Sequence, residues 1–133
     1  MNEHSDLLFD PEHSRRDLPI DLGAQIEKEL IAADVLVSIL RAQAISPEIA
    51  GLLAETILIR SHLALLKSYV LTTYSRVIID PADDDYLILK AISGRLDNAI
   101  LTSGLASTAP EHLHLLVDTI RKGLQIADNL AAS

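Results

Sequence analysis

The stretch SPEIAGLLAETILIRSHLALLKSYVLTTYSR, residues 46–76, decides the fold of this chain. It opens with helix punctuation, because Ser46 can cap, Pro47 suits the first helical position and Glu48 favours the positive end of a helix. We expect one helix over 47–76, about 45 Å long at a rise of ~1.5 Å per residue. Its high aliphatic content predicts that this helix is buried.

Apolar side chains occur nearly all the way round this expected helix. One flank carries Leu52, Ile59, Leu63 and Val70, a second carries Leu53, Ile57, Ala64 and Leu71, and roughly opposite point Leu58 and Leu65. In a single four-helix subunit each helix normally keeps one polar face exposed to solvent. We therefore expect a second subunit to cover the apolar outer face of this helix, most simply in a twofold homodimer. The predicted interface residues are Leu58, Leu65, Leu63 and Val70. The alternative is that the N-terminal tail covers this surface.

Three further helices are expected around this one. One starts after Asp21 and continues as an apolar stripe, a second is opened by Asp80-Pro81 and ends near Ser103, and a third follows the capping-box spacing of residues 108–111. Short connections place sequential helices antiparallel. The sequence therefore predicts an all-α fold: an antiparallel up-down-up-down four-helix bundle over 20–133, preceded by a polar N-terminal tail over 1–19.

The composition restricts the classes of function. The chain has 133 residues, 49% of them hydrophobic, which suits a single domain with an aliphatic core. A formal net charge of −8 disfavours nucleic acid and anionic membrane surfaces, and favours a basic protein partner. The absence of cysteine excludes disulfides and thiolate zinc sites. With no signal-peptide pattern and no run of about 18 consecutive apolar residues, we expect a cytoplasmic protein without a membrane span.

Two cations stand out on the expected helix over 47–76. Arg60 and Lys67 are seven residues apart and point the same way, between two apolar flanks. In one interpretation they pair with acidic side chains of neighbouring helices, such as Asp34 or Asp97, because buried charges are usually paired. In the other they line an anion-binding pocket within the bundle.

Two histidine patterns resemble known sites in part. His62 lies in mid-helix, as the phosphoacceptor of histidine phosphotransfer domains does, but Leu65 and Leu66 stand where those domains carry a lysine and a small residue. Glu111 and His114 have the E-x-x-H spacing of di-iron bundles, but that site needs two such pairs, which only a dimer would supply. Neither pattern is complete. The sequence therefore indicates no catalytic residue, no metal site and no cofactor.

The expected function follows from the apolar helix and the acidic charge. We expect a non-enzymatic protein–protein interaction module, such as a small regulator, adaptor, chaperone or immunity-type inhibitor, acting as a helical homodimer that binds another protein. Two alternatives remain open at this point. One is a helical bundle that binds a small anion or a metal, and the other is a divergent histidine phosphotransfer protein.

Overall fold

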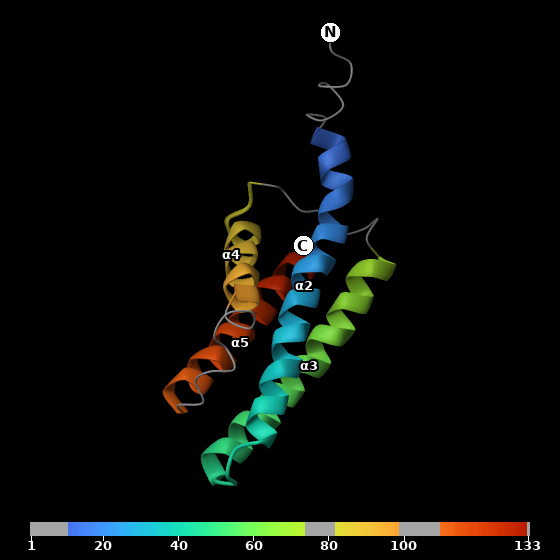
Figure 1. Ribbon diagram of the computed structural model, residues 1–133. Coiled ribbons are helices and arrows are strands. Elements are labelled where there is room, and N and C mark those ends of the chain that lie inside the picture. Colours follow the sequence, from blue (N-terminus) through green and yellow to red (C-terminus); the bar gives the residue numbers. More distant parts are fainter. Residues whose placement is uncertain (1–10, 74–81, 99–109, 133) are drawn as a thin grey trace.

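The computed structural model describes residues 11–73, 82–98 and 110–132, with the side chains of 11–20 and of Pro110 left aside. These residues form four α-helices and no strand: α2 Pro11–Arg41, α3 Pro47–Thr72, α4 Asp84–Asn98 and α5 Pro110–Ala132. Figure 1 shows them as four rods packed side by side. The predicted all-helical fold with four helices is thus confirmed.

The start of α3 is the one that the sequence predicts. The side chain of Ser46 accepts a hydrogen bond from the backbone N–H of Ile49 at 3.1 Å, and Pro47 opens the first turn. At the other end the backbone N–H of Thr73 donates to the Tyr69 carbonyl at 2.9 Å. These two caps satisfy backbone groups that a helix end would otherwise leave unpaired. The predicted extension to Arg76 lies outside the described residues.

The helix α2 begins earlier than the sequence analysis predicts. It starts at Pro11, so residues 11–19 continue the helix instead of belonging to a tail over 1–19. Pro11 is followed by Glu12, the same Pro-Glu pair that opens α3, and proline is well suited to the first helical turn. Pro19, which the sequence analysis includes in the tail, lies within the helix. Residues 1–10 are outside the described part.

The helix α4 begins later than predicted. Its first residue is Asp84, and Asp83 acts as its cap, because the Asp83 carboxylate accepts a hydrogen bond from the Asp85 N–H at 2.8 Å. The Asp83 carbonyl then accepts the first intrahelical bond, from Leu87 at 3.1 Å. In a run of acidic residues several positions can cap, so the sequence alone does not select among them. The predicted cap Asp80 and the predicted end near Ser103 lie outside the described residues.

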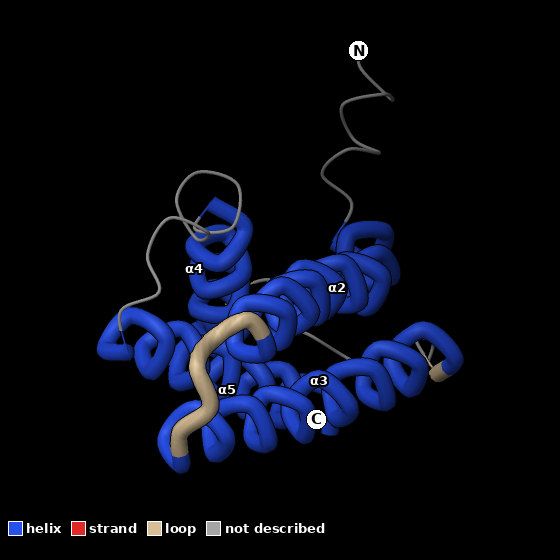
Figure 2. The backbone as a smooth tube through the Cα atoms, turned by 60° about the horizontal axis from the view of Figure 1, so that its bottom comes forward, coloured by secondary structure: helices blue, strands red, loops and turns tan. Residues whose placement is uncertain are grey.

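The four helices share one aliphatic core, and α2 contacts each of the other three. Figure 2 shows α3 and α5 running beside each other beneath α2. A buried tyrosine on α4, Tyr86, donates its hydroxyl hydrogen bond to Asp21 on α2. Burial and this contact raise the pKa of Tyr86. Fully buried large side chains come from every helix: Leu22, Ile26, Leu36, Leu40, Leu63, Leu89, Leu96, Leu113 and Ile120.

Candidate functional site

One continuous line of side chains on α3 faces away from the core. Its seven members are spaced alternately by three and four residues and are all exposed: Gly51, Ala54, Leu58, Ser61, Leu65, Ser68 and Thr72. We call these seven residues the outer seam. Leu58 is 71% exposed and Leu65 is 72% exposed, although a large aliphatic side chain loses roughly 1.5–3 kcal/mol of burial energy when it stays in water. The outer seam is therefore a surface with two exposed leucines that the described residues do not cover, and residues 1–10 of the tail, the alternative cover, lie outside the described part.

The opposite side of α3 lies in the core. Its buried side chains are Leu52, Thr56, Ile59, Leu63, Leu66 and Val70. Leu63 and Val70 are fully buried within the chain, so they cannot face a second subunit and our interface prediction is wrong for both. The reason is that all-round apolarity does not reveal which flank the other helices of the chain take. Leu58 and Leu65, the other two predicted interface residues, stay exposed.

The apolar character of α3 also meets the composition of a membrane-spanning helix. Its best window has a mean hydropathy of 1.6, and α3 is the one helix among the described residues with that length and composition. A core helix of a soluble protein can reach the same value. Here only 28% of the residues in that window are buried. The excess hydropathy therefore lies largely on the surface of the chain.

Three ion pairs connect α3 with α5 at intervals of seven residues. Glu48 Oε1 lies 2.8 Å from His114 Nε2, Glu55 pairs with Arg121, and His62 Nε2 lies 3.8 Å from Asp128 Oδ1. We call these three pairs the ladder. Residue numbers rise together along both helices, so α3 and α5 run in the same direction. The ladder fixes the register of the two helices along one edge of the outer seam.

Two further ion pairs connect α3 with α2 along its other side. Arg60 lies 3.1 Å from the Asp34 carboxylate, which is one of the two partners proposed from the sequence, and Lys67 pairs with Glu27. These pairs are half exposed, so each contributes about 1 kcal/mol or less. Both cations are already neutralised within the chain. The ion-pair interpretation of Arg60 and Lys67 thus has direct support. A hollow of about 370 Å³ lies beside Lys67, and its one lining cation is already paired with Glu27; the lining residues are Leu30, Ala64, Lys67, Ser68 and Leu71.

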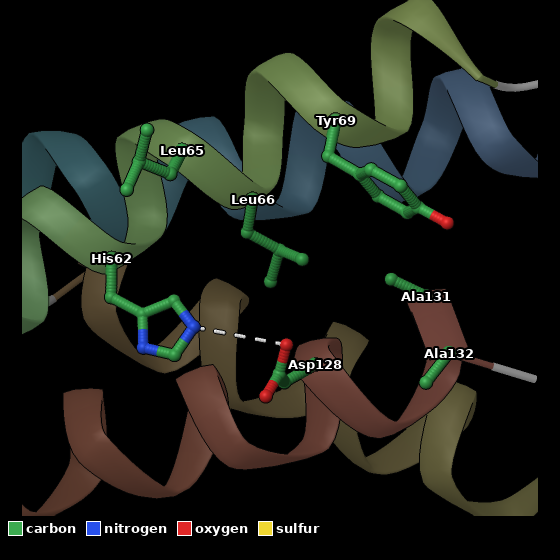
Figure 3. Close-up of a pocket in the computed structure, with 7 residues that line it drawn as sticks. All are labelled: His62, Leu65, Leu66, Tyr69, Asp128, Ala131 and Ala132. Atoms are coloured by element: carbon green, nitrogen blue, oxygen red, sulfur yellow. Dashed lines mark ion pairs between the residues drawn. The ribbon is translucent and has the colours of Figure 1, made fainter.

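A shallow hollow lies where the ladder ends, between α3 and the last turns of α5. Its volume is about 370 Å³, and seven residues line it: His62, Leu65, Leu66, Tyr69, Asp128, Ala131 and Ala132. In Figure 3 the His62 ring turns toward Asp128, and Leu66 lies between His62 and Tyr69. The floor is apolar, and no serine or threonine lines it. The hollow therefore holds a histidine oriented by a carboxylate, but its lining residues include no serine or threonine nucleophile of an acyl-transfer site.

The other candidate metal residues take part in contacts within the chain. His114 pairs with Glu48 of α3. Glu111 lies exposed in the first turn of α5 and takes no part in that pair. Within the described ranges, no group of three or more histidine and acidic residues could hold a metal ion. The E-x-x-H pattern is therefore not assembled into a site by the described residues.

A buried carboxyl group, which the sequence analysis missed, lies in the core. Glu29 is 0% exposed, and neither of its oxygens has a hydrogen-bond partner. Burial raises its pKa to about 8, so the side chain is largely protonated at neutral pH. One turn away, Gln25 accepts a hydrogen bond from Ser93 of α4. The signal was present in the sequence, since Glu29 comes three residues after Ile26 and so falls on the apolar stripe of α2.

Space for this carboxyl group is provided by α5. Gly123 packs directly against it, and a Cβ at that position would overlap a Glu29 oxygen and lie 2.7 Å from Glu29 Cδ. Glycine inside a helix costs about 1 kcal/mol relative to alanine. A buried acid and a mid-helix glycine are each unfavourable alone, but here the glycine leaves the space that the acid occupies.

The comparisons with known proteins give no relative. No protein-family model matches the chain, and neither a curated protein nor a solved structure matches it. The function must therefore be argued from the side chains that the fold places together.

Proposed function

We propose that this protein is a non-enzymatic protein–protein interaction module that acts as a helical homodimer. The observation that carries the proposal is the outer seam of α3, where Leu58 and Leu65 are more than two-thirds exposed on the helix side opposite the core. Exposed apolar surface of this kind marks interaction sites in soluble proteins. A small regulator, adaptor, chaperone or immunity-type inhibitor would use such a surface.

The finer architecture and the setting belong to the same proposal. We take the bundle to be antiparallel and up-down-up-down. The pairs Glu27–Lys67 and Asp34–Arg60 fit this topology, because residue numbers rise along α2 while they fall along α3. A cytoplasmic location fits a cysteine-free chain. The net charge of −8 favours a basic protein as the partner and disfavours nucleic acid.

The test uses paired substitutions of exposed leucines. Leu58→Glu with Leu65→Glu puts charge on the outer seam, whereas the matched control, Leu87→Glu with Leu115→Glu, changes two exposed leucines outside α3. We expect the seam variant alone to lose the association seen by light scattering and the proteins recovered with the tagged chain from its native cells. Identical mass and identical recovered proteins for the seam variant and the wild type would contradict the proposal.

A phosphotransfer role is the second candidate, and one observation supports it. The side chain of His62 is 51% exposed, so a phosphoryl donor could reach it. Against it, Asp128 faces the imidazole and Leu65 and Leu66 flank it. Incubation with acetyl phosphate should leave the chain unmodified, and an acid-labile phosphoryl group that disappears in His62→Gln would establish this role instead.

A further inference from the structure

The outer seam has two columns of different size. Gly51, Leu58, Leu65 and Thr72 follow each other at seven-residue intervals, and Ala54, Ser61 and Ser68 form a second column at the same interval. In heptad terms the first column occupies one core position of a coiled coil and the second occupies the other. The two central residues of the first column are leucines, and the second column holds only small residues. Such a surface can admit another helix at unusually short distance.

A second copy of the same helix is complementary to this surface when it runs antiparallel. In one antiparallel register, Leu58 faces Ser61 of the partner subunit and Leu65 faces Ala54 of the partner subunit. Each large side chain then meets a small one, and the twofold axis makes the match reciprocal. In a parallel arrangement, leucine would meet leucine and serine would meet serine, leaving voids at the small layers, which close-packed interfaces avoid. The antiparallel arrangement is therefore the one that fills space.

The charges of α3 lie outside the surface that would be paired. Every charged or histidine side chain on α3 is engaged by its own chain: Glu48, Glu55 and His62 by α5, and Arg60 and Lys67 by α2. None of the seven outer-seam residues carries a charge. Pairing two outer seams thus places no charged side chain of α3 at a central position of the contact, where its burial would be costly. The remaining opposition is the mutual repulsion of two chains of net charge −8, which salt screens.

We propose that the partner on the outer seam is a second copy of this chain, with the two α3 helices packed closely and antiparallel around a twofold axis near Ile59 and Arg60. The inference rests on the proposed function, which already takes a second copy as the partner, and adds the antiparallel, closely packed geometry of the contact. It makes the small column as important for association as the two leucines. It also implies that association becomes tighter as the salt concentration rises.

The first experiment tests whether the outer seam associates through close packing or through apolar area alone. Ser61→Leu adds apolar area at the centre of the small column, and the control Ala91→Leu adds the same side chain on the exposed side of α4. We expect Ser61→Leu to weaken dimerisation at least tenfold by sedimentation equilibrium, and Ala91→Leu to leave it unchanged. A dimer that is equally tight or tighter in Ser61→Leu would overturn close packing.

The second experiment measures the direction of the helices. The chain has no cysteine, so Ala50→Cys and Ala64→Cys, both exposed on α3 outside the seam, each introduce a single thiol for a spin label. In the antiparallel dimer the two labels at position 50 lie farther apart along the helix axis than the two labels at position 64. The difference is ten residues, which at ~1.5 Å per residue amounts to about 15 Å. Equal distances would indicate parallel helices and overturn the inference.

Failure of the inference can be told apart from failure of the proposed function. A wild-type chain that stays monomeric at high protein concentration overturns both the inference and the homodimer of the proposed function, whereas a dimer with equal label distances overturns the inference alone. The binding of another protein is tested separately by the Leu58→Glu and Leu65→Glu comparison. A chain that floats with uncharged phosphatidylcholine vesicles, and that loses flotation in this double variant, would assign the outer seam to a membrane and overturn both.

Discussion

The outer seam of α3 and the Glu29 site in the core depart from the usual distribution of polarity in opposite directions. At the outer seam, leucines stand in water, and at Glu29 a carboxyl group is completely buried without a hydrogen-bond partner. The first departure can be relieved by another molecule, since none of the described residues packs on that side. The second is relieved by one proton, since a neutral acid costs far less to bury than its anion. The two regions therefore respond to different variables, protein concentration and pH.

The largest expected effect separates the two sides of α3. Leu63→Ala should lower the free energy of unfolding by about 2–5 kcal/mol, because Leu63 is fully buried and its removal leaves a cavity. Leu58→Ala, the same substitution on the exposed side, should change it by less than about 0.5 kcal/mol. Urea unfolding of dilute protein, below the concentration at which it associates, measures both. Equal losses would mean that Leu58 is covered within the chain and would remove the contrast.

The pH dependence tests the Glu29 site. The folded pKa of about 8 lies above the ordinary value of 4.5 for a glutamate, so the stability associated with the proton is present at low pH and is lost as pH rises from about 4.5 through about 8. Between these limits the loss reaches about 3 kcal/mol at pH 7. The free energy of unfolding of Glu29→Gln and of Glu29→Leu, relative to the wild type, should therefore rise by about that amount between pH 5 and pH 7. Glu111→Gln, which changes an exposed carboxyl group on α5, serves as the control.

The glycine opposite Glu29 offers a sharper steric test. Gly123→Ala should cost about 1–3 kcal/mol, because the added methyl group overlaps a side chain that is enclosed by the core. The matched control is Gly94→Ala on α4, where a Cβ meets nothing within 4 Å. That control should stabilise the chain by about 0.5–1 kcal/mol, as alanine does inside a helix. Removing the acid as well, in Gly123→Ala with Glu29→Ala, should recover most of the loss, because the added methyl group then has space. Thermal unfolding compares all of these variants.

The smallest effect is expected at the half-exposed ion pairs. Arg60→Gln should change the free energy of unfolding by less than about 1 kcal/mol, because Asp34 and Arg60 both keep contact with water. A change of several kcal/mol in urea unfolding would show that the pair is shielded from water and would revive a specific role for this cation. High salt should reduce the small effect further.

The sequence predicted the parts of this fold that depend on local chemistry. Ser46 and Pro47 specify the start of α3, and the periodic stripes specify four helices. It failed where tertiary packing decides: apolar residues surround α3, so periodicity could not tell the buried Leu63 from the exposed Leu58. Glu29 was missed because an acidic residue on an apolar stripe reads as an interruption, and only the coordinates show Gly123 making room for it.

The ladder between α3 and α5 also disfavours other alignments of the two helices. If α5 slid by seven residues in one direction, Glu48 would meet Arg121 but Glu55 would meet Asp128. In the other direction Glu55 would meet His114 but His62 would meet Arg121. Each displacement thus keeps one attractive contact and adds one repulsive or unproductive contact, while the observed alignment satisfies all three positions. Individually weak surface contacts can in this way favour a single alignment of two parallel helices.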